Sequence, residues 1–326
     1  MTRRLGLAAG LLVAAVTLAL PAVLDDSALA VYILLGLAAM VTVGVSLLMG
    51  YAGQVSLGQG AFYAIGAYTA ALLALNGAPP LLGLVAAPVA AALSALLIGV
   101  PLLRLRGHHL AFATLAMQLI LLSLAGQLDF TGGDIGLQGI PQFSVGAFEA
   151  SSASVYAYLT WAGLALVMLI THNVITSRPG RALRALATSE IAAASAGIPV
   201  GRYKLVVFAL SATFAGLAGG IYCFYTGYVA PGSFPVLISI QYIVMAVVGG
   251  LGTIWGAVAG AAAITLLVQG LDRLASLPGM PSYAPSVLSY AVYALVLIVV
   301  VLFMPHGLVP AVSRRLSRRR AEVPYR

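Results

Sequence analysis

The chain has 326 residues, of which 62% are hydrophobic and only 7% are charged. Soluble globular domains carry about 25% charged residues, so this composition excludes a soluble protein and indicates one embedded in a membrane. The formal charge of +8 does not indicate nucleic-acid binding, because the basic residues stand in short segments beside apolar runs, as they do on the cytoplasmic side of membrane helices.

The apolar runs are close in length to the roughly 20 residues that an α-helix needs to cross the hydrocarbon core. Membrane β-strands would appear as alternating segments of about 10 residues, so we predict an all-α integral membrane protein. Its ten predicted spans, in chain order, are residues 5–23, 29–49, 57–75, 81–103, 110–128, 155–175, 205–225, 236–248, 257–271 and 286–304.

Two of these spans leave alternatives open. The first follows Arg3 and Arg4 and precedes the small residues 28–30, as in a signal peptide. Its apolar run is longer than the roughly 7–15 residues of most signals, so we predict a retained helix within residues 1–28. The eighth span is short and ends at a glycine-rich segment, so a re-entrant segment is its alternative.

The polar segments divide by charge. When ten spans start from a cytoplasmic N-terminus, Arg273 is the one basic residue that falls outside, and Glu190 and Glu322 are the only acids inside. Removing one central span would place a basic segment on the wrong side. The distribution therefore predicts that both termini, including the basic tail 311–326, are cytoplasmic.

The predicted spans contain no Asp, Glu, Lys or Arg. Ion-driven carriers usually keep such residues at membrane depth, so their absence disfavours an ion-driven mechanism. The chain also lacks an acid–base cluster and a phosphate-binding glycine loop, which argues against an enzyme and against ATP binding by this chain. The single cysteine, Cys223, provides no metal cluster; we expect no metal and no cofactor in this chain.

Small and mildly polar residues are what the spans offer instead. The run Ala215 to Gly220 and the pair Gly256 and Gly260 predict close packing of helix backbones. Six polar residues are candidates for a translocation path, although isolated amides more often hydrogen-bond between helices. These candidates are Gln54, Ser56, Gln59, Gln118, Ser211 and Gln241.

Segment 177–204 is the one long charged stretch between apolar runs. Pro179 suits a first helical turn, Ser189 or Thr188 suits a helix cap, and Gly197 followed by Pro199 suits a helix end. The pattern predicts two short helices that form a rigid element at the membrane surface. A plain basic loop is the alternative.

Five segments together carry a resemblance to a known family. They are Gly50 to Ala61 (GYAGQVSLGQGA), Phe130 to Leu137 (FTGGDIGL), 180–198, 204–219 and 249–256 (GGLGTIWG). Over about residues 29–310, the chain resembles the M-type permease subunits of branched-chain amino acid ABC importers. It departs from that family at 187–189, where the family usually carries more charge.

The resemblance implies the ABC importer permease fold, with an inverted repeat of spans two to five and seven to ten, in a bacterial inner membrane. It implies a subunit that forms the translocation path and works with ATPase subunits, which bind the ATP, with a second and different permease chain, and with a periplasmic substrate-binding protein. The segment expected to dock on the ATPase contains Gly180, Arg181, Ala182, Arg184, Ala185, Glu190, Ala193 and Gly197.

Several alternatives stay open at this point. Branched-chain amino acids are the expected substrates, with urea, short amides and other amino acids as alternatives, and the pore is a homodimer if no second chain takes part. A rival function is an ion-gradient-driven carrier or channel for a small polar solute; another is a membrane enzyme or assembly subunit. The acidic segment 129–154 is predicted to be periplasmic and is a candidate surface for the binding protein.

Overall fold

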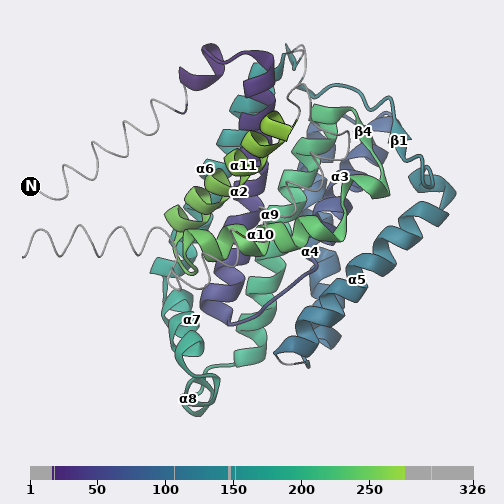
Figure 1. Ribbon diagram of the computed structural model, residues 1–326. Helices are drawn as coiled ribbons and strands as arrows, with labels where there is room; N and C mark the ends of the chain where they lie inside the picture. Colours follow the sequence, from purple (N-terminus) through teal and green to yellow (C-terminus); the bar gives the residue numbers. More distant parts are fainter. Residues whose placement is uncertain are drawn as a thin grey trace, which may run out of the picture.

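The computed structural model describes Thr17, residues 19–105, 107–145, 148–150 and 152–275, and Leu295. The predicted tenth span, the basic tail and most of the predicted first span lie outside these residues. Within them the chain forms a bundle of apolar helices, with two short helices projecting from one end (Figure 1).

Eight apolar helices of the described residues correspond to predicted spans two to nine. They are α2 (Asp26–Ala52), α3 (Gln59–Leu75), α4 (Pro80–Leu102), α5 (His108–Gln127), α6 (Ala153–Thr176), α9 (Val200–Thr226), α10 (Val236–Gly249) and α11 (Ile254–Ala275). Seven described segments are long and apolar enough to cross a membrane, and α3, with 17 residues, is slightly shorter. A helical membrane protein is confirmed, whereas the total of ten spans stays a prediction.

The remaining described elements are short. The 3-10 helices are η1 (Leu20–Ala22), η2 (Asp129–Thr131) and η3 (Pro231–Ser233), the surface helices are α7 (Arg178–Thr188) and α8 (Glu190–Ser195), and the strands are β1 (Leu137–Gln138), β2 (Ser144–Val145), β3 (Phe148–Glu149) and β4 (Tyr228–Val229). β1 pairs antiparallel with β4, and β2 pairs with β3. The first pair attaches the loop after α5 to the link between α9 and α10.

Helices α2 and α9 form the centre of the bundle. In an apolar 18-residue stretch of α2 and of α9, 78% and 67% of the residues are buried, against 28% in the corresponding stretches of α4, α5 and α6. Each has 27 residues and ends at a glycine with positive φ, Gly53 (62°) and Gly227 (64°). Both are followed by a break in the α-helix, which after α9 contains β4 and η3, and then by a shorter α-helix. These matching features are what an inverted repeat requires, but the repeat itself stays a prediction.

Backbone contact between helices is possible because the contacting residues are small. A Cβ atom on Gly66 of α3 would collide with the carbonyl oxygen of Gly216 on α9, and one on Gly219 would collide with that of Tyr63. A Cβ on Gly260 of α11 would likewise collide with the carbonyl oxygen of Met245 on α10. The predicted close packing of 215–220 and of Gly260 is therefore confirmed.

The eighth predicted span is α10, which has 14 residues. At 1.5 Å per residue it covers about 21 Å, less than the roughly 30 Å of the hydrocarbon core. Only together with η3, as segment Pro231–Gly249, does it reach the 19 residues of a candidate span. Figure 1 shows α10 crossing the bundle obliquely. The spanning and re-entrant interpretations therefore both stay open.

Candidate functional site

The charged segment after α6 forms two helices, α7 and α8, that project from one end of the bundle (Figure 1). Pro179 lies in the first turn of α7. The Ser189 hydroxyl accepts a hydrogen bond from the backbone N–H of Ala192 (3.2 Å), which identifies Ser189, not Thr188, as the cap of α8. Gly197 follows α8 with a φ of 79°. The prediction of two short helices is confirmed and a plain basic loop is excluded, but only α8 has a side-chain cap, since Ser177 before α7 makes no cap hydrogen bond.

Three contacts fix these helices to the bundle. A Cβ on Gly180 would collide with the carbonyl oxygen of Ile175 at the end of α6. The same oxygen accepts a hydrogen bond from the Arg184 guanidinium at 3.1 Å. The ammonium of Lys204 lies 2.7 Å from the carboxylate of Glu190 and joins α8 to the first turns of α9. The α7–α8 unit is therefore attached to both α6 and α9.

Helix α11 extends four residues past its predicted end, so Asp272 and Arg273 lie in the helix and not in the loop, and the start of α9 also differs from the prediction. Helix α9 begins at Val200, five residues before the predicted Leu205, so Arg202 and Lys204 lie in α9 and not in the loop. The helix begins directly after Pro199, and the ion pair with Glu190 holds Lys204 against α8.

The predicted docking residues do not share one environment. Gly180 and Ala193 are buried and serve the packing of the unit itself. Ala182 is half-buried, and Glu190 is paired with Lys204. The residues that are exposed for a partner are Arg181, Arg184, Ala185 and Gly197. The sequence interpretation missed Ile191, whose side chain is 82% exposed on α8. An isoleucine among alanines on a short polar helix was the available signal.

Replacing Ser189 by alanine is expected to destabilise α8 by about 1 kcal/mol, because the cap hydrogen bond to Ala192 is lost. Amide exchange over residues 190–195 should accelerate about fivefold, the factor that corresponds to this energy. Hydrogen–deuterium exchange with mass spectrometry measures it. Thr188→Ala is the matched control, because the Thr188 hydroxyl donates within α7 to Arg184. Equal exchange in the two variants would contradict the assignment of the cap.

A second polar region lies inside the bundle, at the break between α2 and α3. Helix α2 ends at Ala52 and α3 begins at Gln59, and the link between them is not helical. Gln54, Ser56 and Gln59 are nonetheless 3%, 1% and 0% exposed. Three predicted path residues are therefore together on one buried, interrupted helix pair, which is where transporters commonly place their binding groups.

Helices α5 and α10 complete this region. The Thr114 hydroxyl on α5 accepts a hydrogen bond from the backbone N–H of Leu57 (2.9 Å). The Ser239 hydroxyl on α10 donates to the Gln118 side-chain oxygen (2.7 Å) and accepts from the Gly60 N–H (2.8 Å). We name Thr114, Gln118 and Ser239, with the two N–H groups that they meet, the polar clasp. It joins α5 to the α2–α3 break and to α10.

Gln59 is fully buried, yet neither its amide oxygen nor its amide nitrogen has a hydrogen-bond partner among the described residues. The side-chain oxygen of Gln54 is in the same situation. A buried polar atom without a partner costs about 1–3 kcal/mol. These amides are therefore suited to a passing polar group.

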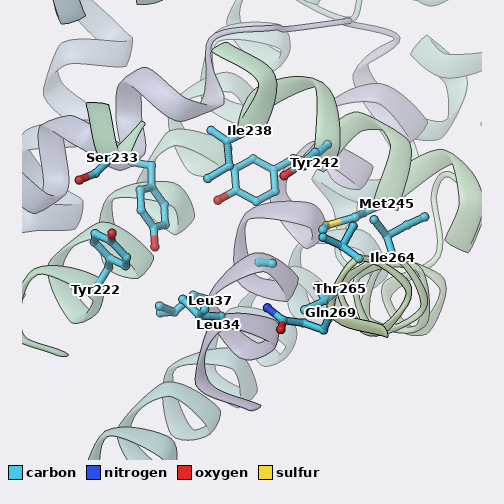
Figure 2. A pocket seen from close by; sticks show the side chains of 14 residues that line it. Leu34, Leu37, Tyr222, Ser233, Ile238, Tyr242, Met245, Ile264, Thr265 and Gln269 are labelled. Carbon is cyan, nitrogen blue, oxygen red and sulfur yellow. The ribbon is translucent and has the colours of Figure 1, made fainter. Parts of the chain in front are cut away.

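The other two predicted path residues lie elsewhere. Ser211 on α9 is buried against Gly44 of α2. Gln241 lines a cavity of about 290 Å³ together with the side chain of Tyr63. Figure 2 shows Tyr222, Ser233, Tyr242 and Gln269 around this cavity. The ring of Tyr63 also packs 5.5 Å (between centroids) from Phe234, whose carbonyl accepts from Gln118. Phe234 thus lies between Tyr63, which lines the cavity, and Gln118 of the polar clasp.

Together, the interrupted helix pair, the buried amides and the attached surface helices define a multi-pass membrane protein built like a transporter subunit. Among the described residues, no group of three or more His, Cys, Asp or Glu could hold a metal ion. The sequence model of the family described as branched-chain amino acid transport system / permease component matches residues 26–301. The chain belongs to this family.

Similar proteins agree with that assignment. The chain is 34% identical over 269 residues to the high-affinity branched-chain amino acid transport system permease protein LivM of Escherichia coli (strain K12), a match that covers 73% of this chain and 60% of that protein. It is 27% identical over 287 residues to LivH of Salmonella typhimurium, which covers 83% of this chain and 90% of that protein. The chain thus spans about 60% of the length of LivM. No solved structure matches it.

Proposed function

We propose that this chain is a permease subunit of an ATP-driven importer and that its substrates are branched-chain amino acids. Membership in a transport permease family is the observation that carries the proposal. The substrate class rests on the names of the LivM and LivH relatives. The proposed location is the bacterial inner membrane, with both termini in the cytoplasm.

The proposed partners are ATPase subunits, a second and different permease chain, and a periplasmic binding protein. The α7–α8 unit is the proposed ATPase contact. Its attachment supports this role, because Gly180 holds it against the end of α6 and the Glu190–Lys204 pair holds it against α9. Since α9 packs on α2, α3 and α4, a displacement of the unit reaches the helices around the polar clasp. For ATP hydrolysis to drive this displacement, the ATPase must contact the unit differently in its two conformational states.

The proposed path passes the α2–α3 break. Gln59 and Gln54 have amide atoms without partners, and Gln118 belongs to the polar clasp that would have to adjust as the path opens. The described residues at this break, Gln54, Ser56 and Gln59, are neutral, which suits a path that must release its solute again. Ser211 and Gln241 stay predictions as path residues.

Replacing Gln59 by leucine is expected to leave the protein equally or more stable, because a buried amide without partners is removed. Uptake is expected to fall about tenfold, the factor for losing one hydrogen bond of roughly 1.4 kcal/mol to the moving solute. Thermal unfolding and uptake of radiolabelled leucine by proteoliposomes measure the two effects. Thr160→Val is the matched control, because the Thr160 hydroxyl is also buried without a partner but lies on α6. Equal uptake in the two variants would show that Gln59 does not contact the transported solute.

The function itself is tested in proteoliposomes that contain the chain with its ATPase subunits, second permease and binding protein. Leucine uptake should require ATP on the side of the membrane that carries the ATPase subunits. It should persist when ion gradients are collapsed. Uptake that follows a proton or sodium gradient without ATP would instead establish the rival secondary carrier.

A further inference from the structure

An apolar groove of about 760 Å³ lies between α5 and the pair α3–α4. Its walls include Leu72 of α3, Ile98 and Leu102 of α4, and Ala113, Ile120 and Leu124 of α5. The groove belongs to the part of the chain that is apolar enough to cross a membrane. An occupant at this depth must therefore be apolar where it meets the groove walls.

The groove exists because α5 is attached to the bundle along a different face. Thr114 and Gln118 bind the α2–α3 break and α10 through the polar clasp. The side turned to α4 carries the small residues Ala113 and Ala116, which do not fill the space. Figure 1 shows α5 at the edge of the bundle, and it makes far fewer contacts with α4 than α9 does.

Two residues with basic side chains lie beyond the end of the groove at which α5 begins. His109, Ala113, Met117, Ile120 and Leu124 follow one another at intervals of three or four residues and so share one face of α5. His109 therefore stands at the end of the groove-lining stripe. Arg104, which is exposed, lies in the turn before α5, and this turn is at the same end of the bundle as α7 and α8 (Figure 1).

The start of α5 also favours an anion. Its cap residue, Gly107, has no side chain, so among the described residues no cap side chain accepts from the backbone N–H groups of the first turn. Such groups, with the positive end of the helix dipole, bind phosphate well. An apolar groove that ends near groups attractive to an anion suits an amphipathic ligand with an apolar chain and a negatively charged head.

We propose that this groove binds an acyl chain of an anionic bilayer phospholipid, whose phosphate lies at the amino end of α5 beside Arg104 and His109. The length is suitable, because Ala113 to Leu128 cover about 22 Å at 1.5 Å per residue, more than one leaflet of a hydrocarbon core of roughly 30 Å. The charge is suitable too, because anionic lipids gather at the membrane face that attracts basic residues.

This lipid fills the space between α4 and α5 and supports α5 from the side opposite its polar attachments. It therefore sets the position of the helix that carries Gln118. The proposal does not depend on the transported substrate, since lipid binding is measured without transport.

The test uses the full chain, purified with its partner subunits in a mild detergent. Co-purified lipid is quantified by mass spectrometry, and delipidated protein is then offered phosphatidylglycerol or phosphatidylcholine in mixed micelles. Wild-type protein is expected to retain phosphatidylglycerol preferentially. Ala116→Trp, which fills the groove, should abolish this preference, whereas Ala165→Trp, at an exposed alanine of α6, should not. Arg104→Gln should reduce retention about fivefold, the contribution of one basic residue at a membrane surface, and Arg104→Lys should preserve it.

Three results would overturn the proposal. The first is equal phosphatidylglycerol retention by the Ala116→Trp and Ala165→Trp proteins. The second is retention of phosphatidylcholine as strong as that of phosphatidylglycerol. The third is a photocrosslinker at Ile120 that captures the second permease chain in place of lipid, which would make the groove a protein interface. Arg104 is exposed outside the core, so its variants report on binding even if the tryptophan in the groove prevents folding.

Discussion

Replacing Gly219 by valine is expected to prevent the bundle from assembling. A Cβ at this position would collide with the carbonyl oxygen of Tyr63 and lie 2.9 Å from the backbone nitrogen of Ala67, both on α3. Helix α9 cannot move away from α3, because α4 lies on its other side. A Cβ atom on Gly220 of α9 would lie only 2.9 Å from the Cβ of Ala87 on α4. Overpacking of side chains costs about 1–3 kcal/mol, and we expect a larger cost here because the colliding atoms belong to the backbone of α3, which cannot change rotamer.

The expected result is loss of the monodisperse peak in size-exclusion chromatography, or a large drop in the unfolding temperature in detergent. Gly201→Val is the matched control, since Gly201 is on the same helix and a Cβ there would meet nothing within 4 Å. That variant should elute and unfold like the wild type. Similar behaviour of the two variants would show that α9 does not pack on α3 as described.

Replacing Ile191 by aspartate is expected to separate the permease from its ATPase. Ile191 is 82% exposed at the projecting end of the α7–α8 unit, while Glu190 beside it is held by Lys204. An exposed apolar side chain on a rigid support is the form of a residue that anchors an interface. Loss of such an anchor costs 2 kcal/mol or more, which weakens binding by about 30-fold.

Binding of the ATPase subunit to the permease in nanodiscs, together with the ATPase rate that the permease stimulates, measures this effect. Ile191→Leu keeps the apolar surface and should bind like the wild type, and the unfolding temperature should not change in either variant, because Ile191 contributes little to the core. Unchanged ATPase binding by Ile191→Asp would place the contact elsewhere on the unit.

Much of the helical framework was predictable because a membrane helix is specified by the length and composition of one apolar run. Helices α4, α5, α6 and α10 begin and end within two residues of their predicted limits. The start of α9 was not predictable. The polar residues Gly201, Arg202 and Lys204 interrupt the apolar pattern, so the apolar run begins at Leu205 although the helix begins at Val200.

The polar site was predictable only in part. Gln54, Ser56 and Gln59 are neighbours in sequence, and an amide such as Gln118 is conspicuous in an apolar run. Hydroxyl groups are not, because most of them bond to their own helix, as Thr171 does to Val167. Ser239 was missed for that reason, although its hydroxyl links α3, α5 and α10. Which polar residues meet is decided by the packing of α5 and α10.

The ion pair between α8 and α9 has a chemical consequence. Lys204 is the only lysine in the chain, and its Nζ atom is occupied by the Glu190 carboxylate. An amine-directed reagent therefore has one side-chain target in this protein, and that target sits where the surface helices join the membrane bundle. Acylation of Lys204 at Nζ would remove its positive charge and so break the ion pair with Glu190 that joins α8 to α9.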